Sequence, residues 1–162
     1  MSRKRNRFMK LGSYKSEFYK PFRALHTVTK YDNLSQDTKM LYILLRASIC
    51  LSKDDPKFRD EPEIFSTFSP EEVAEMLNIP PSNAMGMFTA LENVGLISQT
   101  PWIAVRPHKK YVHPPLTQRQ YHNELTKKLE EATTKTARKK LESDLKKSET
   151  RLKEIERRTK KV

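Results

Sequence analysis

Two short helices joined by a tight turn are predicted between residues 69 and 97, in the segment SPEEVAEMLNIPPSNAMGMFTALENVGLI. Ser69, followed by a proline and two glutamates, is a strong signal for a helix start, because a hydroxyl caps free amides and acids suit the positive first turn. The proline pair after Ile79 ends this helix, and Gly95 ends the second. Such a helix pair is typical of domains that place their second helix in a groove of DNA.

The segments around this pair predict a winged helix. A third helix over residues 35–52 begins at Ser35, and apolar spacing assigns its inner face to Met40, Leu41, Leu44, Leu45, Ser48 and Ile49. The inner faces of the helix pair are Val73, Ala74, Met76 and Leu77, and then Ala84, Phe88, Leu91 and Val94. IFSTF, LISQT and WIAV are prone to form strands, and RPHKKYVHPP is a basic loop. The predicted fold class is therefore mainly α with a small β-wing.

Three regions are expected along the chain: a basic flexible arm at 1–17, a winged-helix domain at 18–115, and a C-terminal region at 116–162. At the start of the domain, Pro21 is expected to bar a helix, so that the aromatic segment after Glu17 packs as an extended arm. Residues 117–162 contain no glycine or proline and are rich in Glu, Lys, Arg and Leu, which predicts one long helix. Its seam at Leu141, Leu145, Leu152 and Ile155 suggests a weak coiled coil and oligomerisation; a lone charged helix is the alternative.

Positive charge is concentrated at the two ends of the chain. Residues 1–23 hold eight Lys or Arg and one acid, residues 24–116 hold nine and eleven, and residues 117–162 hold fifteen and eight. A near-neutral body between basic ends is the pattern of a protein that contacts a polyanion, since each neutralised phosphate releases counterions. Solvated tails are the alternative interpretation.

The second helix of the pair carries no Lys or Arg, yet its outward residues can still recognise bases. The predicted base-reading residues are Ser82, Asn83, Gly86 and Thr89. Asn and Ser can pair with base edges, Thr can touch a thymine methyl, and Gly lets the backbone come close. Phosphate contacts must then come from elsewhere, and the candidates are the wing residues Arg106, His108, Lys109 and Lys110 and the arm residues Arg3, Lys4, Arg5 and Arg7. The alternative is an outer face that is solvated or binds a protein.

Other chemistry finds little support in the sequence. The four histidines and the single Cys50 have no metal-ligand spacing, and with three glycines there is no phosphate-binding loop. No nucleophile motif is present, so no metal, cofactor or enzymatic activity is expected. The longest apolar run contains Arg46 and is too short to span a bilayer. The lone Cys50, expected to be buried, fits a reducing cytoplasm.

Four stretches resemble the N-terminal winged-helix domain of RepA_N-type plasmid replication initiators of Gram-positive bacteria: FYKPFRAL, YDNLSQDTKMLYILLRASICLS, FSPEEVAEMLNI and ALENVGLI. The resemblance covers about residues 18–115, and its later part is also similar to the winged helix of DnaD-type primosomal proteins. It implies binding of double-stranded DNA at repeated origin sites, usually as a homodimer. By position, residues 82–94 would be the recognition helix and the loop around Lys109 the wing. Family initiators continue into a further C-terminal domain, where this chain has a basic helix.

The expected function is sequence-specific binding of double-stranded DNA for the replication, control or maintenance of a plasmid or other mobile element. The alternatives are a protein-interaction module, such as a primosome or conjugation factor, a transcriptional repressor, and RNA binding through the basic C-terminal helix. DNA at repeated or operator-like sites, a second copy of the chain, and replication or conjugation proteins are the expected partners.

Overall fold

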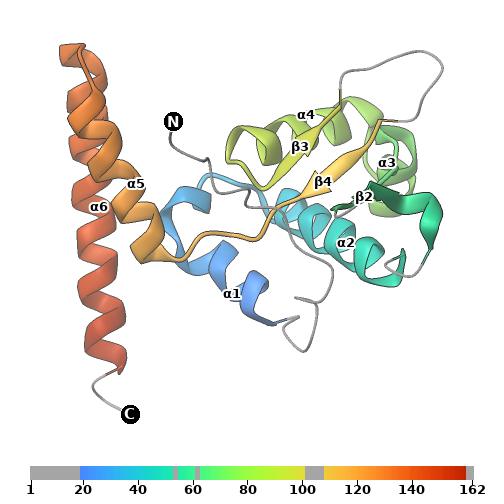
Figure 1. The fold of residues 1–162 in the computed structure, drawn as a ribbon, viewed down its shortest axis with the longest axis horizontal. Helices are drawn as coiled ribbons and strands as arrows, with labels where there is room; N and C mark the ends of the chain where they lie inside the picture. The colour runs from blue at the N-terminus through green and yellow to red at the C-terminus, as the bar shows by residue number, and fades with distance from the viewer. Residues whose placement is uncertain (1–18, 53–54, 61–62, 101–107, 160–162) are drawn as a thin grey trace. The chain divides into compact units, whose positions relative to one another are not determined.

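A computed structural model describes residues 19–52, 55–60, 63–100 and 108–159 of the chain. Its elements, in order, are α1 (Tyr19–Thr27), η1 (Thr29–Tyr31), α2 (Gln36–Ser52), η2 (Pro56–Phe58), β1 (Arg59–Asp60), β2 (Glu63–Ser66), α3 (Pro70–Leu77), α4 (Pro81–Asn93), β3 (Ile97–Gln99), β4 (Lys110–Val112), α5 (Gln118–Glu131) and α6 (Lys135–Thr159) (Figure 1). The predicted fold class, a mainly α chain with a small β-wing and a long C-terminal helix, is confirmed.

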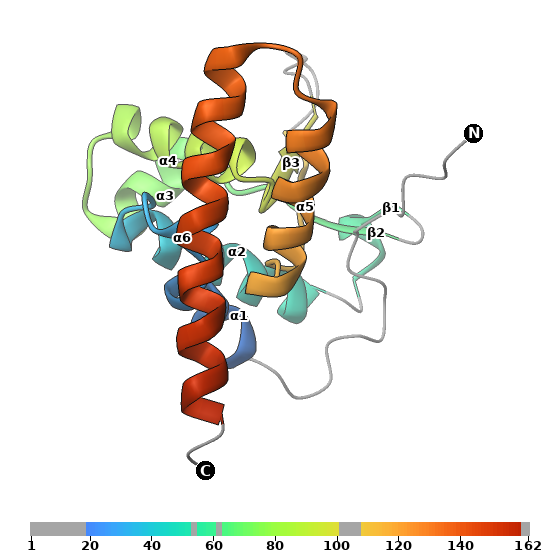
Figure 2. The ribbon, with the colours of Figure 1, turned by 90° about the vertical axis from the view of Figure 1, so that its left-hand side faces the viewer.

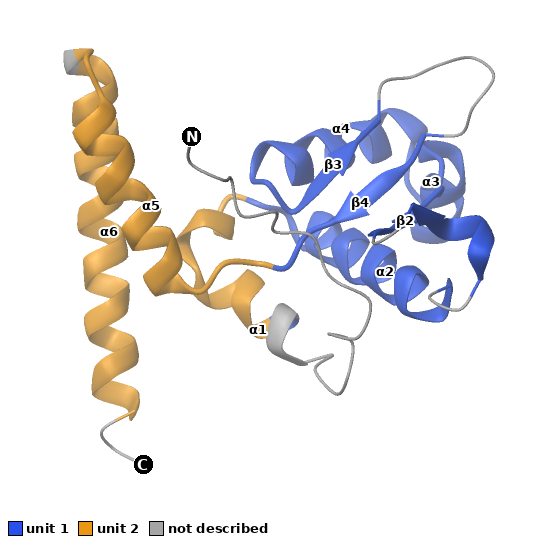
Figure 3. Cartoon of the chain, viewed as in Figure 1, with its two compact units in different colours: residues 1–22, 34–114 blue, residues 23–33, 115–162 orange. Residues whose placement is uncertain are grey.

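The chain divides into two compact units, coloured separately in Figure 3. Unit 1 comprises residues 1–22 and 34–114, and unit 2 comprises residues 23–33 and 115–162. Residues 23–33 therefore cluster with the C-terminal helices, although the sequence pattern predicts that they belong to the winged-helix domain.

Unit 1 combines α2, α3 and α4 with a four-stranded sheet in the order β1-β2-β4-β3, in which all pairings are antiparallel. In register, Phe65 and Ser98 both lie opposite Tyr111, so β4 occupies the interior of the sheet between β2 and β3. The core is formed by side chains that are almost fully buried: Leu41, Tyr42, Leu45, Val73, Ala84, Phe88, Leu91, Leu96 and Ile97. Most of the predicted inner faces are confirmed, since they follow the helical period.

Several local predictions for unit 1 are wrong. Met40 and Met76 are predicted on inner faces, but their side chains are 46% and 49% exposed. Strand β4 lies in the segment predicted as a basic loop. Lys110 and Val112 are buried and Tyr111 between them is half-buried, which is the alternation of a strand. The charged loop after α2 contains η2 and β1. WIAV lies outside the described residues.

The segment expected to be an extended arm forms α1. Pro21 falls in the first turn of this helix, where a missing N–H breaks no intrahelical bond, so it does not bar the helix. Leu25 is fully buried, whereas Phe22 is 47% exposed. Cys50, predicted to be buried, is only half-buried.

In unit 2 the C-terminal residues form two helices instead of one. The chain turns at Ala132–Thr134, and Arg138 N donates to the Thr134 carbonyl at the start of α6. Two adjacent β-branched threonines disfavour a continuous helix at this point. α5 and α6 lie side by side, joined at one end (Figure 2). The seam residues Leu141, Leu145, Leu152 and Ile155 are half-buried within unit 2.

A buried polar cluster joins three segments of unit 2. The Gln118 amide donates to Ser148 Oγ at 2.8 Å and to Thr29 Oγ1 at 3.2 Å, and its oxygen accepts from Thr29 N at 2.9 Å. Gln118 is 4% exposed and Ser148 is fully buried. Because buried polar groups are costly when unpaired, these bonds fix the start of α5 against the middle of α6.

Gln118→Ala should lower the stability of unit 2 by about 1–3 kcal/mol, because Thr29 N and the Ser148 hydroxyl lose their partner. Native-state hydrogen exchange of the α5 and α6 amides measures this loss. Asn123→Ala, at an exposed position of the same helix, is the control and should change stability by less than about 0.5 kcal/mol. Equal effects of the two substitutions would contradict the role of the cluster.

Candidate nucleic-acid interface

The N-terminus of α3 is fixed by a complete capping box. Glu72 N donates to Ser69 Oγ at 3.1 Å, and Ser69 N donates to the Glu72 carboxylate at 2.7 Å. Pro70 occupies the first helical position, where no N–H is needed. The start predicted from the sequence is confirmed, and α3 begins at a defined residue.

The turn between α3 and α4 is set by backbone geometry. Asn78 has a left-handed conformation, with φ of 52°, and Ile79 N donates back to the Ala74 carbonyl at 2.9 Å. This is the arrangement that closes a helix and reverses the chain, and Asn tolerates it better than most residues. Pro81 then starts α4 one residue before the predicted Ser82. The two helices are thereby held at a fixed angle.

α4 buries one side and exposes the other. Ala84, Met87, Phe88 and Leu91 are buried, whereas the four predicted base-reading residues Ser82, Asn83, Gly86 and Thr89 are all exposed. We call these four residues the outer face of α4. A Cβ built on Gly86 would meet nothing within 4 Å, so the middle of the face is open. The Thr89 hydroxyl donates to the Met85 carbonyl at 3.1 Å, which leaves its methyl and its lone pairs outward.

Two neighbours of this face are not among the predicted base-reading residues. Met85 is 60% exposed beside it. The start of the outer face also borders a shallow hollow of about 380 Å³, whose other wall is the first turn of α2 at Ser35, Asp37 and Thr38. No sequence signal brings residues 35–38 to residues 82–86, because this proximity is set by the packing of α2 on α4.

The wing is the β3–β4 hairpin. Thr100 N donates to the Lys109 carbonyl at 3.0 Å, and Lys109 N donates to Thr100 Oγ1 at 3.0 Å, which extends the pairing beyond β3. His108 is half-buried at the edge of the described part of the hairpin. Arg106, predicted to contact phosphate, lies outside the described residues, as do the arm residues Arg3, Lys4, Arg5 and Arg7.

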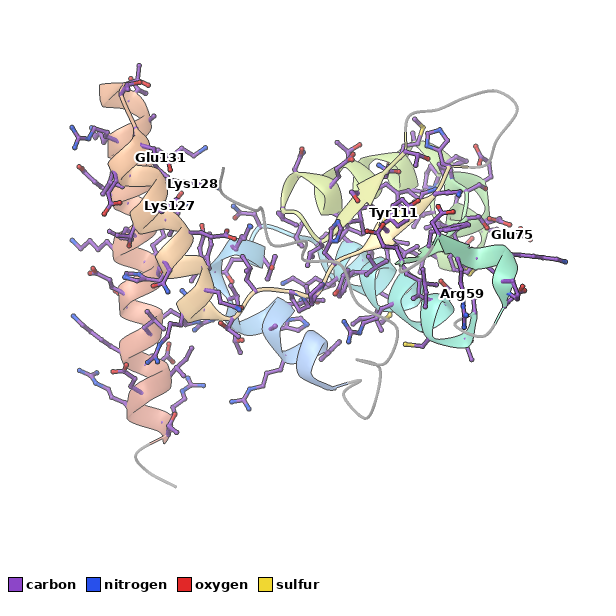
Figure 4. All side chains as sticks on the ribbon, in the orientation of Figure 1. Arg59, Glu75, Tyr111, Lys127, Lys128 and Glu131 are labelled. Atoms are coloured by element: carbon purple, nitrogen blue, oxygen red, sulfur yellow. The ribbon has the colours of Figure 1, made fainter. Side chains whose placement is uncertain are left out.

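Lys109 is engaged within the sheet. Its Nζ donates to both Asp60 oxygens, at 2.8 and 2.6 Å, and lies 4.4 Å from the centroid of the Phe65 ring. The Tyr111 hydroxyl donates to Asp60 at 2.6 Å (Tyr111 is labelled in Figure 4). The Lys109 ammonium and then the Tyr111 hydroxyl hold the pKa of the Asp60 carboxyl below its ordinary value. Burial and the neighbouring Asp60 raise the pKa of Tyr111. No signal in the sequence indicates this cluster.

The sequence predicts Lys110 on the surface of the wing, but the structure buries it. Its side chain is 2% exposed, and Nζ lies 4.7 Å from the centroid of the Phe88 ring. Burial lowers the pKa of Lys110, and the carboxylates of Glu72 and Glu71 partly oppose this effect. The amine borders a pocket of about 510 Å³ that also includes Thr89 and His108. Strand alternation places Lys110 inward, which a loop assignment could not anticipate.

The arrangement suits recognition of base edges better than neutralisation of phosphates. Small polar side chains protrude from a rigid helix, while the nearby lysines are paired or buried. Among the residues that the structure describes, no group of three or more His, Cys, Asp or Glu is placed to hold a metal ion. In the same residues, no helix has the length and apolar character needed to cross a membrane.

The Asp60 carboxyl should titrate below its ordinary pKa of about 3.9, and Lys109→Gln should move that pKa upward. Because the folded pKa is depressed, the stabilisation is complete above the ordinary value and is lost as the pH falls through the folded value. Carboxyl chemical shifts measured by NMR from pH 2 to 6 report both values. An Asp60 pKa that Lys109→Gln leaves unchanged would contradict the assigned cause.

Solved structures with a fold similar to that of this chain include the following three. A structure described as a Rep–DNA complex is 26% identical, with a TM-score of 0.55, covering 75% of this chain and 93% of that chain. A structure of an MDR initiator is 27% identical, with a TM-score of 0.53, covering 70% and 90%. The N-terminal domain of a DNA-binding protein is 24% identical, with a TM-score of 0.54, covering 69% and 86%, and shows the fold alone.

No curated protein matches the chain. The family model of the N-terminus of replication initiator protein A, RepA_N, matches residues 17–134. This match spans the sheet, the helix pair and α5, and it includes the four stretches that carry the resemblance in the sequence. The chain therefore belongs to the RepA_N family of replication initiator N-termini.

Proposed function

We propose that this chain binds double-stranded DNA at specific sites and acts in the initiation or control of replication, or in the maintenance, of a plasmid or similar mobile element. The observation that carries this proposal is the outer face of α4, where Ser82, Asn83, Gly86 and Thr89 are exposed together on a rigid helix. Family membership and the likeness to a structure described as a Rep–DNA complex support DNA as the ligand.

In this proposal the outer face enters the major groove. Asn83 pairs with an adenine edge, Ser82 with a neighbouring base, and the Thr89 methyl contacts a thymine methyl. Gly86 allows the helix backbone to approach, since no protein atom occupies the space in front of it. The absence of Lys and Arg from α4 means that base contacts and phosphate contacts come from different parts of the chain.

Phosphate contacts of unit 1 are assigned to the wing and the basic arm. His108 and Arg106 are the wing candidates, and Lys109 would exchange the Asp60 carboxylate for a phosphate. Lys110 instead holds β4 against Phe88. The arm residues Arg3, Lys4, Arg5 and Arg7 supply further positive charge for the minor groove.

Binding as a homodimer to paired half-sites is part of the same proposal, because two linked copies gain avidity without new base contacts. Leu141, Leu145, Leu152 and Ile155 are partly covered inside unit 2. A dimer contact outside this seam is therefore part of the proposal. Sedimentation of the free chain and of its complex with a paired site measures the stoichiometry.

Selection of bound duplexes from a random-sequence library tests the function. We expect enrichment of one motif, and Asn83→Ala should then cost about 1–3 kcal/mol on that motif while leaving binding to unrelated duplexes unchanged. Electrophoretic mobility shifts measure both affinities. Absence of any enriched motif would overturn the proposal, and an unchanged preference in Asn83→Ala would show that the outer face does not contact bases.

Gly86→Ala separates fold from function. Because alanine is the better helix former and the space is open, this change should stabilise unit 1 by about 0.5–1 kcal/mol. The same methyl group should weaken binding to the selected motif by keeping the helix away from the base edges. Thermal unfolding and mobility shifts measure the two effects, with Asn93→Ala at the exposed end of α4 as the control. If Gly86→Ala binds the selected motif as tightly as the unaltered chain, the backbone of α4 does not approach the base edges closely at Gly86.

A further inference from the structure

One side of α6 carries a row of cations. The helix contains ten Lys or Arg and five acids, and lysine pairs recur seven residues apart at 139–140 and 146–147. A spacing of seven residues is close to two helical turns, so Lys139, Lys146 and Lys153 project from the same side. Arg157 extends this row by one turn. We call Lys139, Lys146, Lys153 and Arg157 the α6 cationic face.

Packing within unit 2 shows that the α6 cationic face is turned to solvent. Ser148 is fully buried, and Leu145 and Leu152 are half-buried on the same side of the helix. All four residues of the α6 cationic face are exposed, and so are Ser143 and Thr150 between them. The apolar seam is therefore turned into unit 2, and a row of cations and hydroxyls is turned to solvent.

Two of the five acids of α6 form ion pairs with residues outside this face. Glu154 pairs with Arg151 at 3.1 Å and with Arg158, and Glu156 lies 3.8 Å from Arg119 on α5. Within the described residues, no ion pair involves a member of the α6 cationic face. Lys153 and Arg157 stand four residues apart, where like charges destabilise a helix and an acid would have stabilised it.

The dimensions of the face match a nucleic-acid backbone. From residue 139 to residue 157 a helix rises roughly 27 Å, which is about eight base pairs of B-DNA at 3.4 Å each. The hydroxyls of Ser143 and Thr150 lie between the cations, and both hydroxyls and lysines are common phosphate ligands. A membrane surface fits less well, because a helix that lies on lipid needs a free apolar side, and here α5 and residues 23–33 cover that side.

Beyond the wing and arm contacts proposed above, the described part of unit 1 offers few cations for contacts with phosphate. α4 has no Lys or Arg, Lys109 is paired with Asp60, and Lys110 is buried. Resting on the function proposed above, we propose that the α6 cationic face binds the phosphate backbone of duplex DNA irrespective of sequence, while α4 selects the site. Unit 2 is then a second DNA-binding element and not a dimerisation helix.

The salt dependence of binding to a random-sequence duplex tests this inference. Removing one phosphate contact should reduce the slope of log Kobs against log salt by about 0.9. Lys146→Gln with Lys153→Gln should therefore reduce the slope by roughly 1.8. The matched control is Lys127→Gln with Lys128→Gln, which removes the same charge from exposed positions of α5 (labelled in Figure 4). It should leave the slope unchanged.

Equal reductions in both variants would overturn the inference, because net charge alone would then explain the effect. No reduction in the Lys146/Lys153 variant would overturn it as well, provided that circular dichroism shows an intact helix. Lys146→Arg with Lys153→Arg, which keeps both positive charges, should give the same slope as the unaltered chain. Tighter binding of duplex RNA than of duplex DNA, with loss of RNA affinity in the glutamine variant, would reassign the face to RNA and overturn the choice of DNA.

The two proposals fail separately. If Asn83→Ala leaves sequence preference unchanged while the slope still falls in the Lys146/Lys153 variant, the α4 proposal fails and the α6 inference stands. If the slope is unaffected but an enriched motif is lost in Asn83→Ala, the α6 inference fails alone. In the glutamine variant, the ratio of affinities for selected and random duplexes should equal that of the unaltered chain.

Discussion

The Lys110 amine lies 4.7 Å from the centroid of the Phe88 ring, and this contact joins β4, an interior strand of the sheet, to the helix proposed to enter DNA. A buried ammonium is costly, and its attraction to an aromatic ring and to the nearby Glu71 and Glu72 carboxylates offsets part of that cost. Phe88 also belongs to the side of α4 that packs on the core. One aromatic ring thus sets the position of the wing and the outward direction of the outer face together.

Features with a local cause were predictable from the sequence. The capping box at Ser69 depends on four consecutive residues, and the inner side of α4 follows from the spacing of Ala84, Phe88 and Leu91. The same spacing identified the outward Ser82, Asn83, Gly86 and Thr89. The helical period does not separate a fully buried residue from one at the margin, so it assigns Met40 and Met76 inward although about half of each side chain is exposed.

Features that depend on distant residues were not predictable. The role of Lys109 depends on Asp60, which lies 49 positions earlier in the chain, and only the strand register brings them together. The break in the C-terminal region carries only a weak sequence signal, the two adjacent threonines, because Ala132–Thr134 contains neither glycine nor proline. The buried Gln118–Ser148 contact also favours the break, since it holds the start of α5 against the middle of α6. Runs of Lys and Arg show which segments of the chain are basic, but they do not show which side of α6 carries the exposed cations.

The outer face of α4 has a consequence for how such chains diversify. Ser82, Asn83, Gly86 and Thr89 are exposed, and the core of unit 1 is complete without their side chains. Apart from helix propensity, as at Gly86, folding therefore places little constraint on replacements at these four positions. Under the proposed function, selection would act on them mainly through DNA. Lineages that share one scaffold would then drift apart in target preference by single changes, so that two related elements could coexist in a cell without competing for each other's sites.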